Sequence, residues 1–315
     1  MCTCIAMRKN CFLFGRNMDI DYSFGEQVII TPRNFPLTFK KTEPLGKHYA
    51  IIGMAAEAEG YPLYAEGINE NGLCMAALKF PHNARYTESS STGKTGIAPY
   101  ELIPWVLGKC RNLTEARTLM TETEIINIPF NENLSVSPLH WMISDSSSSL
   151  VLECTEKGMK IYDNPTDVLT NNPPFPAQLQ NLTKYSHLKT DFNPENAYSL
   201  GLGAVGLPGD FSSPSRFARA DFLLKNTPES ETTVSDFFHI LDNLAVPRGA
   251  VITPDGKYHF TTYSCCMDIK EQRYYFKTCH SGSIFSVSLT PETSGGSKII
   301  SFKLPQENNF RAFPL

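Results

Sequence analysis

The order of the apolar segments limits which folds this chain can adopt. Residues 3–8 and 11–15 read as two short strands joined at Lys9-Asn10, a pattern typical of a β-hairpin. Strands come in hairpin-like runs, helices follow in clusters, and strands then return, so the pattern favours an antiparallel α+β layered fold over a parallel βαβ one. Further strands are predicted at 28–32, 49–54, 72–78, 140–144, 149–154, 259–263, 274–277, 284–288 and 298–302, and helices at 99–110, 112–120, 177–188, 215–225 and 234–244.

Composition narrows the class of protein. The chain has 315 residues, 41% hydrophobic and 19% charged content and a net charge of −4, which is ordinary for one soluble domain spanning 1–315. This balance offers no basic surface for nucleic acid, and no apolar run reaches the ~18 to 20 residues of a membrane span. No signal-peptide pattern opens the chain, so we expect a cytoplasmic protein.

Cofactor and metal motifs are missing from the sequence. The nine cysteines form neither an even disulfide framework nor a CxxC zinc pair. A GxGxxG string occurs at 201–206, but Pro208 and Gly209 follow it where a nucleotide-binding fold needs a helix, so we interpret it as a loop. We therefore expect no cofactor and no metal.

Cys2 is the strongest candidate for chemistry. A cysteine directly behind the initiator methionine is small enough for Met1 to be removed, which leaves a mature chain beginning at Cys2. That residue then carries both a thiol and an α-amine, with ordinary pKa values of roughly 8.5 and 7.7 to 8.0. The amine can accept the thiol proton near neutral pH, so one residue supplies both the nucleophile and the base.

Four polar residues have suitable positions to serve such a nucleophile. Arg16 and Asp19 lie at a strand end one hairpin away from Cys2, and Asn171 follows a short apolar strand. Arg216 lies in the first turn of a predicted helix, where a buried cation opposes the helix dipole and needs a carboxylate or a substrate as partner. Together they offer charges to position the amine and an amide to stabilise an oxyanion.

These residues belong to six motifs that occur in order along the chain. The motifs are Met1-Cys-Thr, Gly15-Arg-Asn-Met-Asp19, Asn69-Glu-Asn-Gly-Leu73, Leu139-His-Trp141, Val168-Leu-Thr-Asn-Asn-Pro173 and the segment from Gly206-Leu-Pro-Gly-Asp to Ser-Arg-Phe217. Together they strongly resemble the choloylglycine hydrolase family, the bile salt hydrolases and penicillin V acylases among the N-terminal-nucleophile hydrolases. The resemblance implies a four-layer αββα fold with two stacked antiparallel sheets, a homotetramer, and amide hydrolysis through a thioester acyl-enzyme without a cofactor.

The resemblance also implies roles for these residues. Cys2 is similar to the family's nucleophile, with Arg16 and Asp19 as its electrostatic partners. Asn171 corresponds to the side-chain oxyanion donor, and Arg216 to the second arginine of the site. The freed α-amine would then activate the water that releases the acid.

One position departs from the family pattern. This chain reads Leu78-Lys-Phe-Pro81 where bile salt hydrolases usually have asparagine and penicillin acylases have tyrosine in place of Lys79. In the family this residue gives a backbone N–H to the oxyanion hole, which survives the substitution, whereas its side-chain contact does not. We expect retained hydrolysis with altered substrate preference, the cation either pairing with an anionic glycine or taurine end or pointing into solvent.

A steroid acyl group requires a broad apolar cleft. By alignment of the motifs the cleft residues are Met18, Ala65, Phe130, Leu134 and Leu139, with Phe24 as a neighbour, although each would equally fit a core.

The substrate is expected to be a small amphipathic amide. Leu139-His-Trp141 and Thr170-Asn-Asn-Pro173 resemble bile salt hydrolases, whereas Val246-Pro-Arg-Gly-Ala-Val251 and Arg273-Tyr-Tyr-Phe-Lys277 are more similar to penicillin V acylases. We favour conjugated bile salts and leave open glycine against taurine. The alternatives are a penicillin V or acyl-homoserine-lactone acylase, and a non-catalytic binder of amphipathic acids.

Overall fold

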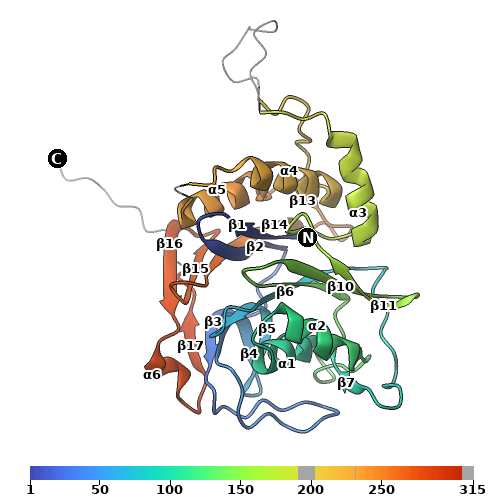
Figure 1. The fold of residues 1–315 in the computed structure, drawn as a ribbon, viewed down its shortest axis with the longest axis vertical. Coiled ribbons are helices and arrows are strands. Elements are labelled where there is room, and N and C mark those ends of the chain that lie inside the picture. Colours follow the sequence, from blue (N-terminus) through green and yellow to red (C-terminus); the bar gives the residue numbers. More distant parts are fainter. Residues whose placement is uncertain (191–202, 231, 307–315) are drawn as a thin grey trace, which may run out of the picture.

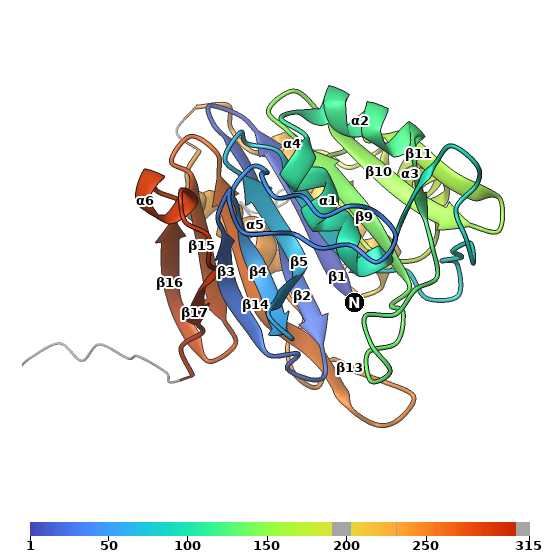
Figure 2. The same cartoon turned by 90° about the horizontal axis from the view of Figure 1, so that it is seen from below.

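The computed structural model describes residues 1–190, 203–230 and 232–306, and its elements stack in four layers. Figure 1 shows helices at the top and bottom of the molecule with two sheets between them, and Figure 2 shows the lower helices in front of their sheet. The pairings within both sheets are antiparallel. This arrangement confirms the predicted αββα fold.

The first sheet carries the N-terminus on the strand next to one of its edges. Its strand order in the described residues is β12-β1-β2-β14-β15-β16, with β13 paired to β14. These strands are β1 (Cys2–Arg8), β2 (Phe12–Ile20), β12 (Val168–Leu169), β13 (Val251–Ile252), β14 (Tyr258–Asp268), β15 (Arg273–Thr278) and β16 (Ser281–Ser288).

The second sheet lies against the inner face of the first, and β6 passes beneath β1 and β2. Its strand order in the described residues is β11-β10-β9-β6-β5-β4-β3-β17. These strands are β3 (Glu26–Thr31), β4 (Ile51–Ala58), β5 (Tyr61–Asn69), β6 (Cys74–Lys79), β9 (Leu139–Ser144), β10 (Ser149–Thr155), β11 (Gly158–Asp163) and β17 (Ile300–Lys303). A separate parallel pair joins β7 (Thr95–Ile97) to β8 (Thr123–Ile125).

Helices cover the outer face of each sheet (Figure 1). α4 and α5 pack on the first sheet and α3 packs on α4, while α1 and α2 pack on the second sheet. The start of α5 is held by a capping box between Thr233 and Asp236, which satisfies two backbone N–H groups. The helices are α1 (Leu102–Lys109), α2 (Leu113–Thr121), α3 (Phe175–Leu182), α4 (Ser213–Asn226), α5 (Val234–Leu244) and α6 (Pro291–Ser294), with 3₁₀ turns η1 (Pro99–Glu101) and η2 (Thr183–Tyr185).

Two strands approach so closely that only glycine fits between them. A Cβ on Gly15 in β2 would lie 1.9 Å from the carbonyl oxygen of Cys265 in β14. The absence of a side chain at Gly15 lets β2 and β14 stay paired here, with Gly15 opposite Cys266 and Arg16 opposite Cys265. Gly15 therefore helps to bring β14 against the strand that carries Arg16 and Asp19.

Several predicted boundaries were wrong. The strand predicted at 11–15 runs on to Ile20, so Arg16 lies in the middle of β2, whereas Asp19 is next to its last residue. Both side chains are buried among partners from other elements. The sequence also missed β5 and β11, and the helix predicted at 177–188 ends as α3 at Leu182. Residues 201–202 of the glycine string lie outside the described residues, and 203–206 form a turn.

No helix in the part of the chain that the structure describes is both long and apolar enough to cross a membrane.

Candidate active site

Cys2 begins β1 and is buried between the two sheets. Its Cα pairs with that of Met18 across the β1–β2 hairpin, and its Sγ lies 3.7 Å from the Met18 Sδ. Only 1% of the residue is exposed. The thiol therefore contacts the Met18 thioether on one side. The polar groups around it come from segments distant in sequence.

Asn171 contacts the backbone nitrogen that would become the α-amine. Its Oδ1 accepts hydrogen bonds from the Cys2 N–H at 2.7 Å and from Arg216 Nη2 at 2.9 Å. Its Nδ2 donates to the Lys79 carbonyl at 2.8 Å. The loop that follows β12 is fixed by Ser213, whose hydroxyl accepts from the Asn171 N–H at 2.8 Å. One amide side chain thus links β1, β6 and α4.

Arg216 extends from the first turn of α4 to the backbone of Cys2. Its Nη1 donates to the Cys2 carbonyl at 2.6 Å and also to the Thr3 hydroxyl, and it lies 3.9 Å from Asp19 Oδ2. Burial lowers the pKa of Arg216, and the Asp19 carboxylate opposes that shift. Asp19 in turn accepts a 2.6 Å hydrogen bond from the Thr261 hydroxyl. The carboxylate partner expected for this buried arginine is Asp19.

Arg16 projects from β2 into a gap in the opposite sheet. The register of β4 and β5 shifts at Ala65, so β5 bulges there and diverges from β6. The Arg16 Nη1 fills the gap by donating to the carbonyls of Ala65 at 3.4 Å and of Ala77. Its Nη2 lies 3.5 Å from Met18 Sδ, which is also the neighbour of the Cys2 thiol.

The guanidinium of Arg16 has a carboxylate partner that the sequence analysis missed. Glu66 Oε2 lies 3.5 Å from Arg16 Nη1, with both side chains fully buried. The Tyr274 hydroxyl donates to Glu66 at 2.7 Å, and that of Tyr263 donates at 2.9 Å. Burial raises the pKa of Glu66, while Arg16 and the two hydroxyls oppose the shift. A charged residue within the mostly apolar segment that forms β5 was the signal that could have identified Glu66. It was not used because β5 itself was not predicted.

The backbone of Lys79 faces the same space. The Phe80 N–H donates to Pro138 at 2.9 Å, so the preceding Lys79–Leu139 pair is a non-hydrogen-bonded one. Both backbone polar groups of Lys79 therefore point away from β9, as the contact between its carbonyl and Asn171 Nδ2 requires. The Lys79 N–H therefore lies on the same side of β6 as the carbonyl that Asn171 contacts.

A cavity of about 280 Å³ opens beside Cys2 and is mainly apolar. The segment from Ile128 to Leu139 forms one wall, and β2 and β5 form others. Leu134 is 44% exposed at the rim, whereas Ala65 and Met18 lie deeper. All six side chains predicted for the cleft line this cavity: Met18, Phe24, Ala65, Phe130, Leu134 and Leu139.

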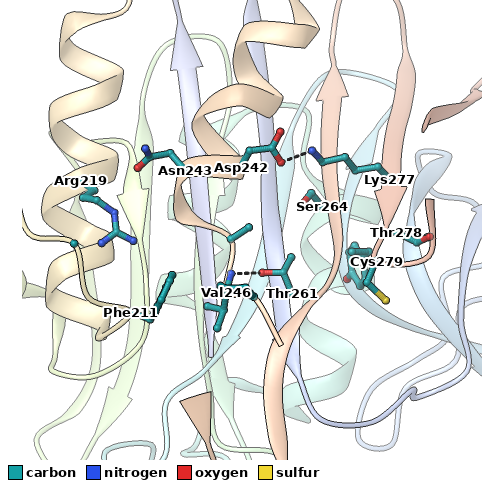
Figure 3. Close-up of a pocket in the computed structure, with 14 residues that line it drawn as sticks. Phe211, Arg219, Asp242, Asn243, Val246, Thr261, Ser264, Lys277, Thr278 and Cys279 are labelled. Carbon is teal, nitrogen blue, oxygen red and sulfur yellow. Dashed lines mark hydrogen bonds and ion pairs between the residues drawn. The ribbon is translucent and has the colours of Figure 1, made fainter. Parts of the chain in front are cut away.

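A larger cavity of about 600 Å³ does not contain Cys2 and shares no lining residue with the first. Figure 3 shows Arg219 on one side and the Asp242–Lys277 ion pair on another, with Thr261 between them. The Thr261 hydroxyl accepts from the Val246 N–H at 2.8 Å and donates to Asp19. We assign the chemistry to the smaller cavity because it holds the only predicted nucleophile. Among the described residues, no cluster of three His, Cys, Asp or Glu side chains is suited to a metal ion.

Comparison with known proteins identifies the family. Residues 2–302 match the family model described as linear amide C–N hydrolases, choloylglycine hydrolase family. The chain is 44% identical to a bile salt hydrolase/transferase of Lactiplantibacillus plantarum, with 99% of both chains covered. It is 38% identical to a bile salt hydrolase/transferase of Clostridium perfringens, over 96% of this chain and 97% of the relative.

Solved structures of related proteins show the same fold. A mutant conjugated bile acid hydrolase from Clostridium perfringens superposes with a TM-score of 0.94 at 35% identity, with 100% of both chains covered. A penicillin V acylase from Agrobacterium tumefaciens shares the fold, with a TM-score of 0.78 at 22% identity, over 96% of this chain and 91% of that one. The chain therefore belongs to the choloylglycine hydrolase family of linear amide C–N hydrolases.

Proposed function

We propose that this protein hydrolyses the amide bond of glycine- or taurine-conjugated bile salts, with Cys2 as the nucleophile after Met1 is removed. The observation that carries the proposal is the position of Cys2, which lies at one end of an apolar cavity and within a network of Arg16, Asp19, Asn171 and Arg216. The full-length relatives with 44% and 38% identity support the choice of substrate, because both are named bile salt hydrolase/transferase.

The first half of the reaction forms a thioester. The Cys2 amine accepts the thiol proton, and the sulfur attacks the amide carbon. Negative charge then develops on the carbonyl oxygen, and the Lys79 N–H and the Asn171 Nδ2 donate hydrogen bonds to it. The contact between Asn171 Nδ2 and the Lys79 carbonyl supports this assignment. As the C–N bond breaks, the proton held by the Cys2 amine passes to the leaving nitrogen, so glycine or taurine departs as an amine.

The second half returns the enzyme to its starting state. The neutral Cys2 amine takes a proton from water, and the resulting hydroxide attacks the thioester carbon. The C–S bond breaks, the bile acid leaves, and the sulfur regains its proton. Asn171 Oδ1 orients the amine in both halves, since it accepts a hydrogen bond from this nitrogen at 2.7 Å.

The steroid would occupy the apolar part of the cavity. Phe24, Phe130 and Leu134 offer apolar surface there, and the neutral ring system of a bile acid requires few polar contacts. The segment from Ile128 to Leu139 supplies much of that surface, so its side chains would set how well different acyl groups fit.

Product release from glycocholate, taurocholate and penicillin V, measured side by side, tests the proposal. We expect hydrolysis of at least one bile salt with higher kcat/KM than penicillin V, and loss of turnover in Cys2→Ala. Turnover by Cys2→Ala at the parental rate would move the nucleophile elsewhere. Release from penicillin V alone would make the protein an acylase of that class, and tight binding of bile salts without release would make it a binder.

Intact mass tests the processing step. We expect active protein to lack Met1, because the α-amine of Cys2 exists only after its removal. Fully retained Met1 in active protein contradicts the mechanism.

We also propose that the protein assembles as a homotetramer, as its resemblance to the family implies. Light scattering after size exclusion should then give a mass four times the 35.1 kDa of the chain. A monomer mass at the concentration of the activity assay would contradict this part of the proposal.

A further inference from the structure

We propose that the Lys79 side chain recognises the anionic end of the amine that the substrate releases. The ligand chemistry is a carboxylate or a sulfonate held a few bonds beyond the nitrogen of the cut amide. This inference rests on the proposed function and deepens it, because it assigns a residue to the leaving-group side of the reaction. It also decides between the two positions that the sequence left open for this cation.

The backbone of Lys79 is linked to that of Cys2 through one side chain, Asn171. The Lys79 carbonyl accepts from Asn171 Nδ2 at 2.8 Å, and the same amide holds the Cys2 nitrogen. The Lys79 side chain then enters the cavity that contains Cys2, where its Nζ makes a long 3.4 Å contact with the Ser137 hydroxyl. A substrate amide placed on Cys2 therefore lies within reach of this flexible side chain.

The charge of Lys79 has no counter-ion among the described residues. Within the same residues, the cavity is lined by two cationic side chains, Arg16 and Lys79. Arg16 is fully buried and already paired with Glu66, whereas no described carboxylate lies within ion-pair distance of Lys79. Burial lowers the pKa of Lys79, and the Cys2 thiolate opposes that shift. A half-buried ammonium with one neutral contact would gain from an anionic ligand.

The chemistry of a conjugated bile salt fixes which end that anion occupies. The steroid acyl half is neutral, so its natural place is the apolar surface around Phe130 and Leu134. The only formal charge sits on the amine half, as a glycine carboxylate or a taurine sulfonate. With the amide at Cys2 and the steroid on the apolar surface, the charged end of the amine half is the part of the substrate that can pair with the Lys79 ammonium.

Paired substrates with and without this charge test the inference. The first pair is glycocholate and its methyl ester, and the second is taurocholate and the amide of cholic acid with ethylamine. The variants are Lys79→Met, which keeps the length of the side chain but removes the charge, and Lys79→Arg, which keeps a cation. Lys160→Met is the matched control because Lys160 is exposed on β11, away from the cavity.

We expect the ratio of kcat/KM for the anionic over the neutral member to fall by about three- to tenfold in Lys79→Met, mainly through KM, as for a partly exposed ion pair. Lys79→Arg should retain most of the ratio, and Lys160→Met all of it. The wild-type ratio should also fall as the salt concentration rises. Comparing the glycine and taurine pairs shows whether the carboxylate or the sulfonate depends more on Lys79.

An equal loss for both members of a pair would overturn the inference, because it would show that Lys79→Met disturbs the oxyanion position and not charge recognition. An unchanged ratio would overturn it as well. Neither result contradicts the proposed function, because that function is tested by wild-type hydrolysis of bile salts and not by the ratio. If the wild type hydrolyses penicillin V but no bile salt, the proposed function fails, and penicillin V with its methyl ester becomes the pair that tests Lys79.

Discussion

Arg16 and Glu66 belong to opposite sheets and form an ion pair fully withdrawn from solvent, with Nη1 and Oε2 3.5 Å apart. Met18 connects the pair to Cys2, since its sulfur touches both the Arg16 guanidinium and the Cys2 thiol. Burying two charges gains little net stability, but removing one of them leaves the other without compensation. Glu66 therefore serves mainly to hold the Arg16 guanidinium, and its charge, in one place near Cys2.

Replacing Glu66 by glutamine should weaken both the fold and the reaction. The neutral amide would leave the buried Arg16 cation without its carboxylate, so the free energy of unfolding should fall by about 3 kcal/mol. We expect kcat to fall about tenfold or more while KM changes little, since Glu66 does not line the substrate cavity. Urea unfolding and steady-state kinetics measure the two effects.

Tyr274→Phe provides the matched control for this network. It removes a 2.7 Å hydrogen bond to Glu66 but leaves the charge pair in place. We expect a loss of about 1 to 3 kcal/mol in stability, with a smaller loss in kcat than in Glu66→Gln. Equal kcat in Glu66→Gln and the wild type would contradict a role for this carboxylate in positioning Arg16.

Thr261 should matter for the reaction although it does not touch Cys2. Its hydroxyl donates to Asp19 Oδ1 at 2.6 Å, while Asp19 Oδ2 has no hydrogen-bond partner among the described residues. Thr261→Val removes this bond to a buried charge, which is worth about 1.5 to 3 kcal/mol, so kcat/KM should fall roughly tenfold or more. Thr261→Ser keeps the hydroxyl and should recover most of the activity. A loss of equal size in both variants would point to packing of the Thr261 methyl group instead.

The sequence predicted the members of the site better than the elements that carry them. Arg16, Asp19, Asn171 and Arg216 were found because each belongs to a short motif whose residues are adjacent in the chain. The structure places all four side chains around Cys2. Their catalytic roles remain predictions for the experiments above.

Glu66 was missed for a physical reason. The bulge at Ala65 breaks the period-two alternation that identifies a strand, so β5 gave no clear pattern. Its partners come from β2, β14 and β15, and only the tertiary fold brings them together. Long-range contacts of this kind leave no local signal, whereas Thr233 and Asp236, three residues apart, show their capping box in the sequence itself.

Gly53 should be intolerant of any side chain because it lies against the bulge that positions Glu66. A Cβ there would lie 2.0 Å from the Glu66 carbonyl oxygen. Gly53→Ala must displace β5, so we expect about 1 to 3 kcal/mol of destabilisation together with a loss of kcat. Gly282→Ala in β16 is the matched control, since nothing lies within 4 Å of its Cβ position. Thermal unfolding and kinetics of both variants check this, and wild-type values for Gly53→Ala would show that the bulge shifts freely.

The pH dependence of hydrolysis should reflect the pKa of the Cys2 α-amine. Burial lowers the pKa of the Met1 α-amine, while the Cys2 thiolate and Asp19 oppose the shift. Removing Met1 moves the amine to Cys2, which is only 1% exposed, so we expect burial to lower the pKa of that amine as well. A base acts only when unprotonated, so activity is lost as pH falls through this pKa, and the acid limb of kcat/KM should lie below about pH 7.7. A profile of kcat/KM against pH measures this limb, and a midpoint above about pH 8 would contradict a buried amine as the base.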